Sequence, residues 1–221
     1  MGVPHGHPER VVLDRVTFAY SEDDPPVFTD LSMRFPREGL VALQAPNGSG
    51  KSTLVELVSG YLRPGAGRVL VCGHDASSPR ARPWRRVVRT RPALYPAMSV
   101  YDHLAFSSQL AGSRLHGVLE RAGRYRLADW LDTRADELSS GTERKLWLLM
   151  CTLGNFDVVM LDEPFIALDD QARAELNREM CQWREEGRLV VVAAHGSPDG
   201  FQPTTTLRLP APRATEKEKK E

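Results

Sequence analysis

One loop carries the clearest chemistry of the chain. Residues 45–53 read APNGSGKST and lie between the apolar runs 40–43 and 54–58. That order predicts a strand, a glycine-rich loop and a helix, which is the setting of a phosphate-binding loop. Gly48 and Gly50 let successive backbone N–H groups turn toward an anion, and the helix adds its positive N-terminal end. We name residues 45–53 the phosphate loop.

Two side chains of the phosphate loop have specific roles. Lys51 places a mobile cation on the β- and γ-phosphates, and Ser52 offers a hydroxyl ligand to Mg²⁺. The usual pattern begins with glycine, but Ala45 stands there, which affects the entry turn more than the cradle. A loop that only turns the chain is the alternative. We expect a nucleotide to contact Asn47, Gly48, Ser49, Gly50, Lys51, Ser52 and Thr53.

An acidic pair follows a second apolar run. Residues 158–161 read VVML and lead directly into Asp162 and Glu163. Ligands of open α/β sheets bind at the carboxyl ends of parallel strands. We therefore expect Asp162 to hold Mg²⁺ through water, and Glu163 to polarise the water that attacks the γ-phosphate. A strand end that is acidic by chance is the alternative, and the phosphate loop disfavours it.

A short polar segment precedes a helix. Residues 138–142 read LSSGT, and we name them the signature segment. Ser140 and Glu143 have the spacing of a capping box, which is a purely structural explanation. A helix N-terminus with a serine hydroxyl also suits a second phosphate contact. The residues alone leave both explanations open.

The elements that must position these residues alternate as in an α/β fold. Residues 99–134 have helical spacing and predict a helical insertion between strands of a parallel sheet. We expect helices from the phosphate loop to Gly60, at 146–153 and at 171–186. We expect strands at 11–20, 28–35, 40–43, 68–72, 157–161, 189–194 and 205–209.

An arginine run lies just before the insertion. Arginines stand at positions 80, 82, 85, 86, 89 and 91, and the stretch 76–101 contains no acid. A solvated helix face is the explanation that we favour. A basic patch toward anionic lipid or an acidic partner is the alternative.

Composition limits the classes of function. The 221 residues include 29 Lys and Arg against 29 Asp and Glu, so overall charge favours neither a nucleic-acid nor a membrane-surface partner. The N-terminus lacks the apolar core of a signal peptide, and the longest apolar runs are too short to span a bilayer. Three scattered cysteines fit no zinc or disulfide framework and indicate a reducing cytoplasm. A membrane role would therefore act through another subunit.

Taken together, these motifs resemble the ATP-binding cassette of an ABC transporter. The resemblance runs from about residue 11 to residue 209. It rests on the phosphate loop, on the signature segment LSSGT, where the family usually has LSGGQ, and on Asp162-Glu163-Pro164 followed by Ala167-Leu168-Asp169. The order and spacing of the set make it specific.

The resemblance implies roles for further residues. His195 matches the family's switch histidine, which contacts the γ-phosphate, and joins Glu163 and Lys51 as a catalytic candidate. Tyr20 matches an aromatic residue that stacks on adenine. Nucleotide binding is implied for Tyr20, Ser139, Gly141 and Asp169 as well as for the phosphate loop.

One departure from the family concerns the strand that enters the insertion. The family has a glutamine there that contacts Mg²⁺ and the attacking water, and an ungapped match places Thr90 at that position. Threonine is shorter and would reach the cation only through a water. Thr90 is therefore a weaker metal candidate than Ser52 and Asp162. Either coupling to the membrane subunit runs through other residues, or hydrolysis is slowed while binding survives.

The resemblance also implies a fold, namely an α/β P-loop NTPase with a parallel-sheet core, an antiparallel β subdomain and a helical insertion. We expect a single ABC ATPase domain at residues 10–210. Residues 10–90 and 155–210 would form the RecA-like core with the β subdomain, and 91–154 the helical and signature subdomain. Residues 211–221 are a charged tail that cannot bury a core.

The function implied is ATP hydrolysis that powers a membrane transporter. Two cassettes, identical or different, close on ATP and Mg²⁺, and hydrolysis releases them. The expected partners are a transmembrane permease subunit and a second cassette, with no nucleic acid. The expected location is the cytoplasm, on the inner face of the cell membrane through the permease. A PALYP segment at residues 92–96 resembles compact ABC-2 and haem-exporter cassettes, so we expect an exporter.

Two other functions compete with this one. A non-transport ABC ATPase of DNA repair or translation is disfavoured, because the chain has neither long coiled coils nor a second cassette. An ATP-binding regulatory or assembly subunit with weak hydrolysis is suggested by Ala45, Thr90 and the altered signature segment. Measuring turnover with the membrane partner present separates that alternative from the transporter ATPase.

Overall fold

Two sheets organise the chain in the computed structural model, which describes residues 9–46, 48–195 and 200–210. The first sheet is antiparallel, in the order β2-β1-β4-β5, and the second is parallel, in the order β6-β7-β8-β3-β9. The strands are β1 (Glu9–Phe18), β2 (Phe28–Pro36), β3 (Gly39–Gln44), β4 (Ala66–Val71), β5 (His74–Asp75), β6 (Arg85–Val88), β7 (Val158–Asp162), β8 (Leu189–Ala193) and β9 (Thr205–Arg208). The helices are α1 (Lys51–Ser59), α2 (Val100–Ala111), α3 (Leu115–Arg124), α4 (Ser140–Cys151) and α5 (Asp170–Glu185).

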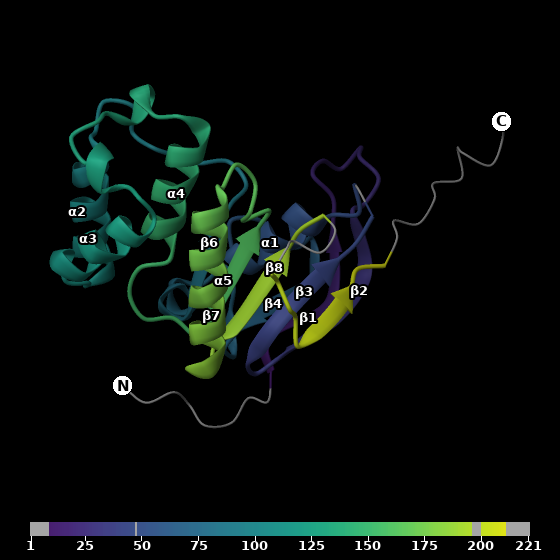
Figure 1. The fold of residues 1–221 in the computed structure, drawn as a ribbon. Coiled ribbons are helices and arrows are strands. Elements are labelled where there is room, and N and C mark those ends of the chain that lie inside the picture. Colours follow the sequence, from purple (N-terminus) through teal and green to yellow (C-terminus); the bar gives the residue numbers. More distant parts are fainter. Residues whose placement is uncertain (1–8, 47, 196–199, 211–221) are drawn as a thin grey trace.

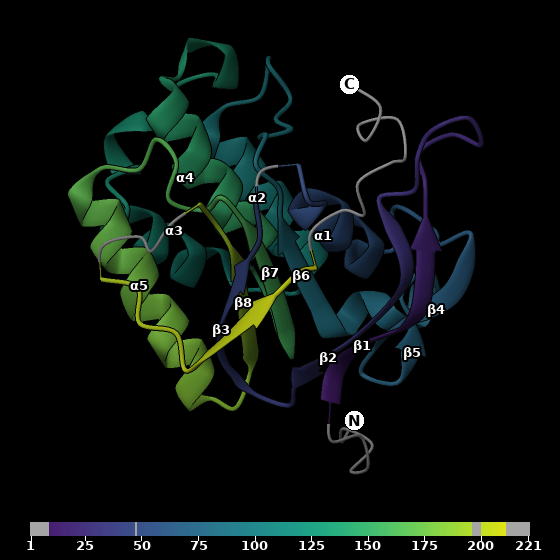
Figure 2. The same cartoon turned by 90° about the vertical axis from the view of Figure 1, so that its right-hand side faces the viewer.

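The parallel sheet is covered on both faces. Its central strands β3, β7 and β8 are buried almost throughout, which explains their continuous apolar sequences. Side chains alternate across a strand, so Leu40 and Ala42 of β3 face one core while Val41 and Leu43 face the other. Helix α5 and the insertion pack into the first core, and α1 with the antiparallel sheet packs into the second (Figure 2).

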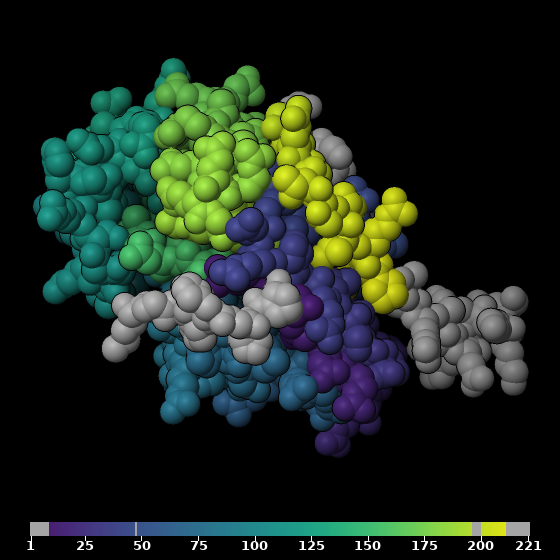
Figure 3. Space-filling view, turned by 90° about the horizontal axis from the view of Figure 1, so that it is seen from below, coloured from purple at the N-terminus to yellow at the C-terminus, as the bar shows by residue number. Residues whose placement is uncertain are grey.

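The last described strand completes the sheet at its edge. Strand β9 pairs in parallel with β3, although the two strands are far apart in sequence. Just before β9, for example, the Thr204 hydroxyl accepts a hydrogen bond from the Leu40 N–H, 164 residues away. In the space-filling view the yellow residues of β9 lie against the indigo residues of the early strands (Figure 3). This places the phosphate loop, which follows β3, between two neighbouring strands.

The helical insertion is confirmed. Helices α2, α3 and α4 gather at one end of the molecule, away from the antiparallel sheet (Figure 1). Ser99 and Asp102 form a capping box at the start of α2, and Gly112 ends that helix in the left-handed conformation. Helix α4 begins earlier than expected, at Ser140. Within the described residues no helix is both long enough and apolar enough to cross a membrane.

The expected capping box of Ser140 and Glu143 is wrong. The N-cap of α4 is Ser139, whose hydroxyl oxygen accepts a hydrogen bond from the backbone N–H of Thr142 at 3.2 Å. Ser139 has the extended backbone that an N-cap requires, whereas Ser140 is already helical. Ser139, which is expected to contact a phosphate, is therefore also the residue that caps α4.

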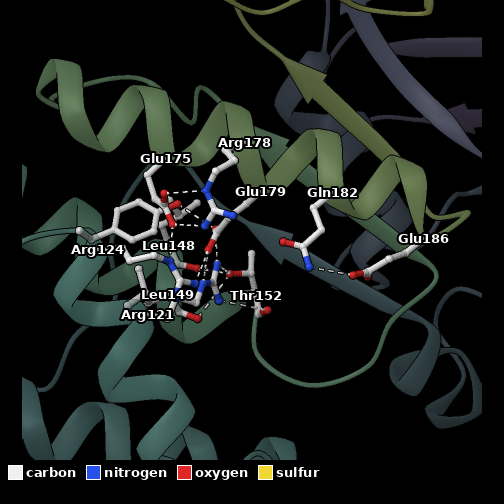
Figure 4. Close-up of polar contacts among 11 residues, drawn as sticks. Arg121, Arg124, Leu148, Leu149, Thr152, Glu175, Arg178, Glu179, Gln182 and Glu186 are labelled. Carbon is white, nitrogen blue, oxygen red and sulfur yellow. Dashed lines mark hydrogen bonds and ion pairs between the residues drawn. The ribbon is translucent and has the colours of Figure 1, made fainter.

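A buried ionic cluster attaches the insertion to α5 (Figure 4). The guanidinium of Arg121 on α3 donates to both carboxylate oxygens of Glu179 on α5, each at 2.6 Å. The hydroxyl of Tyr125 donates to Glu179 at 2.8 Å, and Arg121 also donates to Thr152 Oγ1 at 2.7 Å. A more exposed set of ion pairs at its rim joins Arg124, Glu175 and Arg178.

The arginine run forms a solvated helix face only in its first part: Arg80 and Arg82 are exposed on a 3₁₀ helix, whereas Arg85, Arg86 and Arg89 are buried or half-buried, so the expectation is wrong for these three. It contains a short 3₁₀ segment and β6, which pairs with β7 at the edge of the parallel sheet. Arg85 donates to the carbonyl of Ser59, and Arg86 donates to that of Leu153 at 2.8 Å. Arg89 makes a bidentate pair with Glu56, at 2.6 and 2.8 Å. All three guanidiniums therefore donate to groups of the chain itself, although Arg85 Nη1 is buried without a hydrogen-bond partner among the described residues.

Candidate functional site

A cavity of about 410 Å³ opens at the carboxyl ends of the parallel strands. The phosphate loop between β3 and α1 lines it, together with residues at or just beyond the ends of β6, β7 and β8. This is where open α/β sheets bind ligands, because loops from several strands converge there. The lining residues are Tyr20, Val27, Gly48, Ser49, Gly50, Lys51, Ser52, Thr53, Thr90, Asp162, Glu163 and His195.

The backbone of the phosphate loop requires glycine. Gly50 is the N-cap of α1 with φ at 92°, a left-handed conformation. A Cβ there would lie 2.7 Å from the side chains of both Val27 and Phe28, so no larger residue fits without movement. Gly48 is also left-handed, but a Cβ there would meet open space. Asn47, which we also expect at the phosphates, lies outside the described residues.

The polar side chains of the loop are turned onto the loop itself. Lys51 is largely buried, and its Nζ donates to the carbonyl of Ala45 at 2.9 Å and to that of Pro46 at 3.4 Å. Ser49 Oγ donates to the same Pro46 carbonyl at 2.7 Å. The ammonium is therefore held by two neutral carbonyl groups, which an anionic phosphate would outcompete. Ser52 is exposed at the first turn of α1.

Tyr20 reaches the site from the antiparallel sheet. Its hydroxyl lies 2.8 Å from Thr53 Oγ1, and its ring packs edge-on against Phe18 with centroids 5.1 Å apart. The side chain is nevertheless 63% exposed, which leaves ring surface free beside α1. An exposed, anchored aromatic ring is suited to stacking on a planar base.

Thr90 and Asp162 meet directly across two strand ends. Thr90 Oγ1 donates to Asp162 Oδ2 at 2.9 Å, and Asp162 is only 5% exposed at the end of β7. The threonine thus contacts the carboxylate expected to hold the cation, a contact that its short side chain did not suggest. It leaves the other oxygen, Oδ1, for a cation or its waters.

Glu163 follows in a strained position. Its φ of 47° is left-handed, which is uncommon for a residue with a Cβ, and its N–H donates to the Ala193 carbonyl at 2.8 Å. The backbone N–H of His195 lies 3.4 Å from Oε2, and His195 Nε2 lies 3.5 Å from Oε1. Among the described residues Oε1 is buried without a hydrogen-bond partner, and His195 is its ion-pair neighbour.

The signature segment and Asp169 lie elsewhere. Ser139, Gly141 and Asp169 are not among the described residues that line the cavity, although all three were expected to contact nucleotide. A Cβ on Gly141 would lie 2.8 Å from the Ala167 carbonyl, so the two segments are in close contact. Asp169 caps α5 and pairs with Lys145 of α4, and the hydrogen bond from Lys145 lowers the pKa of that carboxyl. Ser139 and Asp169 are exposed.

One buried arginine beside the site was missed by the sequence interpretation. Arg144 of α4 is 3% exposed, and its guanidinium donates to the carbonyls of Arg89, Thr90, Asp162 and Glu163. Burial lowers the pKa of this guanidinium. Its position shortly after the signature segment could have indicated a role at the site. A charged residue on a helix, however, usually lies on an exposed face.

The donor set suits a hard cation held jointly with a substrate. Ser52, Thr90 and Asp162 offer oxygen atoms, which Mg²⁺ prefers. Within the described residues no group of three or more His, Cys, Asp or Glu side chains is arranged to hold a metal alone. Mg²⁺ is typically bound by one or two carboxylates together with substrate phosphates and water, so the residues present fit that ion.

Comparisons with known proteins point to one family. The family described as ABC transporter matches residues 28–166. A protein named taurine import ATP-binding protein TauB from Pseudomonas savastanoi pv. phaseolicola is 32% identical over 209 residues, covering 90% of this chain and 78% of the relative. A protein of the same name from Ruegeria pomeroyi is 29% identical over 192 residues, covering 83% and 70%.

Solved structures show the same fold. An ATP-binding subunit of an ABC transporter has a TM-score of 0.79 at 22% identity and covers 90% of this chain and 85% of its own. A bacterial Atm1-family exporter with ATP bound has a TM-score of 0.79 at 24% identity, covering 95% and 39%. A bacterial ABC transporter cassette described as dimeric has a TM-score of 0.79 at 18% identity, covering 90% and 94%. These likenesses confirm the predicted α/β architecture.

Proposed function

Because this chain belongs to the ABC transporter family and is one of its ATP-hydrolysing, ATP-binding subunits, we propose that it powers a membrane transporter through ATP-driven pairing with a second cassette. One observation carries the proposal. The phosphate loop, Asp162 and Glu163 line a single cavity, and one buried oxygen of Glu163 has no hydrogen-bond partner among the described residues, with His195 Nε2 3.5 Å away. A phosphate cradle opposite a carboxylate is the arrangement that transfer of a phosphoryl group to water requires.

We assign ATP binding to three regions of the cavity. The adenine stacks on Tyr20, and the phosphates lie on the backbone N–H groups of residues 48–53 at the positive end of α1. Lys51 exchanges its two carbonyl acceptors for the β- and γ-phosphates. The exchange keeps the ammonium hydrogen-bonded in both states.

The proposed cation is Mg²⁺, held by Ser52 and by Asp162 through water, with Thr90 as a weaker third group. When bound, Mg²⁺ neutralises charge that develops on the β- and γ-phosphates. Thr90 aligns the Asp162 carboxylate through its direct hydrogen bond. Glu163 accepts the proton of the attacking water at its unpartnered oxygen, and His195 contacts the γ-phosphate.

The second half of each site is proposed to come from another cassette. Ser139, Gly141 and Asp169 lie outside the cavity of their own chain, and Ser139 and Asp169 are exposed. They are therefore free to meet a nucleotide bound elsewhere. One solved structure with this fold is described as dimeric, which supports the pairing.

The proposed membrane partner is a separate permease subunit, which would hold this chain at the inner, cytoplasmic face of the cell membrane. The named relatives are import proteins, so they do not support the export expected from the PALYP segment. We propose import instead. Transport into vesicles of defined orientation, measured with the permease present, tests that direction.

The function is tested by turnover of the purified chain. We expect Mg²⁺-dependent phosphate release, and we expect the Glu163→Gln variant to bind ATP normally while its kcat falls by about 10³-fold or more. The Lys51→Ala variant is expected to lose ATP affinity and activity together. Glu163→Gln turnover at the wild-type rate would show that the assigned base is wrong. If the wild-type chain with its permease releases phosphate no faster than a sample without protein, the ATP-binding regulatory alternative is favoured.

A further inference from the structure

Arg144 joins two strand ends that no longer pair with each other. Within the described residues the pairing of β6 with β7 ends at Val88 and Leu161. Just beyond, Arg144 Nη1 donates to the carbonyls of Arg89 at 2.6 Å and Thr90 at 2.8 Å.

The other terminal nitrogen serves the second strand. Arg144 Nη2 donates to the carbonyls of Asp162 at 2.9 Å and Glu163 at 2.8 Å. Each nitrogen of the planar fork therefore holds one strand end, and the guanidinium replaces the backbone hydrogen bonds that the diverging strands have lost. The nearby indole N–H of Trp147 adds a bond to the Arg89 carbonyl at 3.2 Å.

The residues held in this way are those that face the cation and the attacking water. The Thr90 hydroxyl reaches Asp162 Oδ2 at 2.9 Å, and Glu163 sits in its left-handed conformation immediately after Asp162. Arg144 itself is not among the described residues that line the cavity. It is therefore placed to set the distances between catalytic groups without touching the substrate.

Arg144 also stands on the same helix as the signature segment. Ser139 caps α4 through the Thr142 N–H, so Ser139 and Arg144 belong to one continuous α-helical element. A helix moves as a rigid unit over such a short length, because its backbone hydrogen bonds link every turn. A displacement at Ser139 is consequently transmitted to the carbonyls held by Arg144.

We propose that Arg144 is a positioning residue that couples the two nucleotide sites of a cassette pair. The inference rests on the proposed function, in which Ser139 contacts the ATP bound to the partner cassette. Occupation of that distant site moves α4, and Arg144 transmits the movement to Thr90, Asp162 and Glu163 of its own site. The groups that bind the cation and activate water are then aligned only when both sites are filled.

The test compares Arg144→Met and Arg144→Lys with a matched control, Arg86→Met, in the purified full chain. Arg86, which lies on β6, likewise donates to two main-chain carbonyls, at 2.8 and 2.9 Å, but these belong to Leu153 and Arg85, which do not line the cavity. Measurements are kcat, KM for ATP, the Hill coefficient for ATP and the Mg²⁺ concentration at half-maximal rate.

For Arg144→Met we expect kcat to fall by about 10- to 100-fold, with KM for ATP changed by less than about threefold. The Hill coefficient should fall from above unity to unity, because the coupling between the sites is lost. The Mg²⁺ concentration at half-maximal rate should rise by about threefold or more, since Thr90 and Asp162 lose their alignment. Arg86→Met should leave all four quantities near their wild-type values.

Wild-type kcat and Hill coefficient in folded Arg144→Met would overturn the proposal. Equal losses in Arg144→Met and Arg86→Met would also overturn it, because they would show a merely structural role. If Arg144→Met does not fold, the Hill coefficient of Arg144→Lys tests the coupling instead. A compact ammonium cannot hold both strand ends, so an unchanged Hill coefficient in that variant would contradict the coupling. Absence of turnover in the wild-type chain would instead refute the proposed function itself.

Discussion

Thr90 illustrates how one side chain changes the interpretation of the site. The sequence predicted a threonine too short to reach a cation directly, and that remains a prediction about the cation. The structure adds that the hydroxyl lies 2.9 Å from Asp162 Oδ2. A hydrogen bond to a buried carboxylate orients it, and such bonds are stronger than those between neutral groups. Thr90 is thus better described as a hydrogen-bond partner of Asp162 than as a replacement for the metal-contacting glutamine of the family.

The Thr90→Val substitution keeps the shape of the side chain and removes its donor. We expect the Mg²⁺ concentration at half-maximal ATPase rate to rise about tenfold, which corresponds to about 1.4 kcal/mol for a lost charge-assisted hydrogen bond. ATP binding without Mg²⁺ should not change. Thr205→Val, at an exposed position of β9, is the control. An unchanged Mg²⁺ dependence in Thr90→Val would rule out the alignment role.

At the scale of elements, the insertion is attached to the core at two places that differ in chemistry. Helix α4 meets the strand ends through the Arg144 guanidinium and main-chain carbonyls. Helix α3 meets α5 through the cluster of Arg121, Tyr125 and Glu179 (Figure 4). Burial and the neighbouring Glu179 carboxylate raise the pKa of the Tyr125 hydroxyl, so it remains a donor. Both attachments cross the boundary that we propose between residues 91–154 and 155–210.

Breaking the cluster should therefore be costly. The Arg121→Met substitution leaves Glu179, a 4% exposed residue, without its bidentate partner. We expect the free energy of unfolding to fall by about 3 kcal/mol, because the buried carboxylate keeps only the Tyr125 hydroxyl and the more distant Arg124 guanidinium. Urea unfolding followed by circular dichroism measures this change.

The matched control for this experiment is Arg178→Met. Arg178 pairs with Glu175 at the exposed rim of the cluster, where ion pairs contribute about 0–1 kcal/mol. A loss in Arg178→Met as large as that in Arg121→Met would mean that burial does not decide the strength of the cluster.

At the scale of the whole molecule, the residues that we propose to bind nucleotide lie in two separate regions of the chain. The cavity holds the phosphate loop, the acidic pair and His195, while Ser139, Gly141 and Asp169 lie outside it. Since Ser139 and Asp169 are exposed, a second copy or a related cassette is the natural source of the missing contacts. ATP bound between two cassettes would then stabilise the pair, and its hydrolysis would release it.

This arrangement predicts ATP-dependent association. We expect the Glu163→Gln variant to change from monomer to dimer in size-exclusion chromatography when Mg²⁺ and ATP are added, because bound ATP persists. Lys51→Ala should remain monomeric under the same conditions, since it lacks the phosphate contact. A Glu163→Gln chain that stays monomeric at every ATP concentration contradicts homodimer formation and points to a different second cassette.

The local patterns of the sequence were sufficient for the phosphate loop, the acidic pair and most strands and helices, but not for β5 or β6. Apolar runs such as 40–43 and 158–161 became buried central strands, because continuous apolar sequence suits a strand covered on both faces. Tyr20, Thr90, Asp162, Glu163 and His195 line one cavity with the phosphate loop, as their motif positions suggested. The phosphate loop, the acidic pair and the buried strands follow from short-range spacing, whereas Tyr20, Thr90 and His195 were implied by the resemblance to the ABC cassette.

The placement of buried charge required the folded chain. Arginines 85–89 looked like a solvated face but belong to a strand region whose guanidiniums find carbonyl and carboxylate partners. Arg144 bonds to the Arg89 carbonyl from 55 residues away, and to the Asp162 carbonyl from 18. A charged side chain is buried only where folding brings such acceptors together, and no local pattern records that meeting. The link between the signature helix and the carboxylates is therefore a property of the tertiary structure.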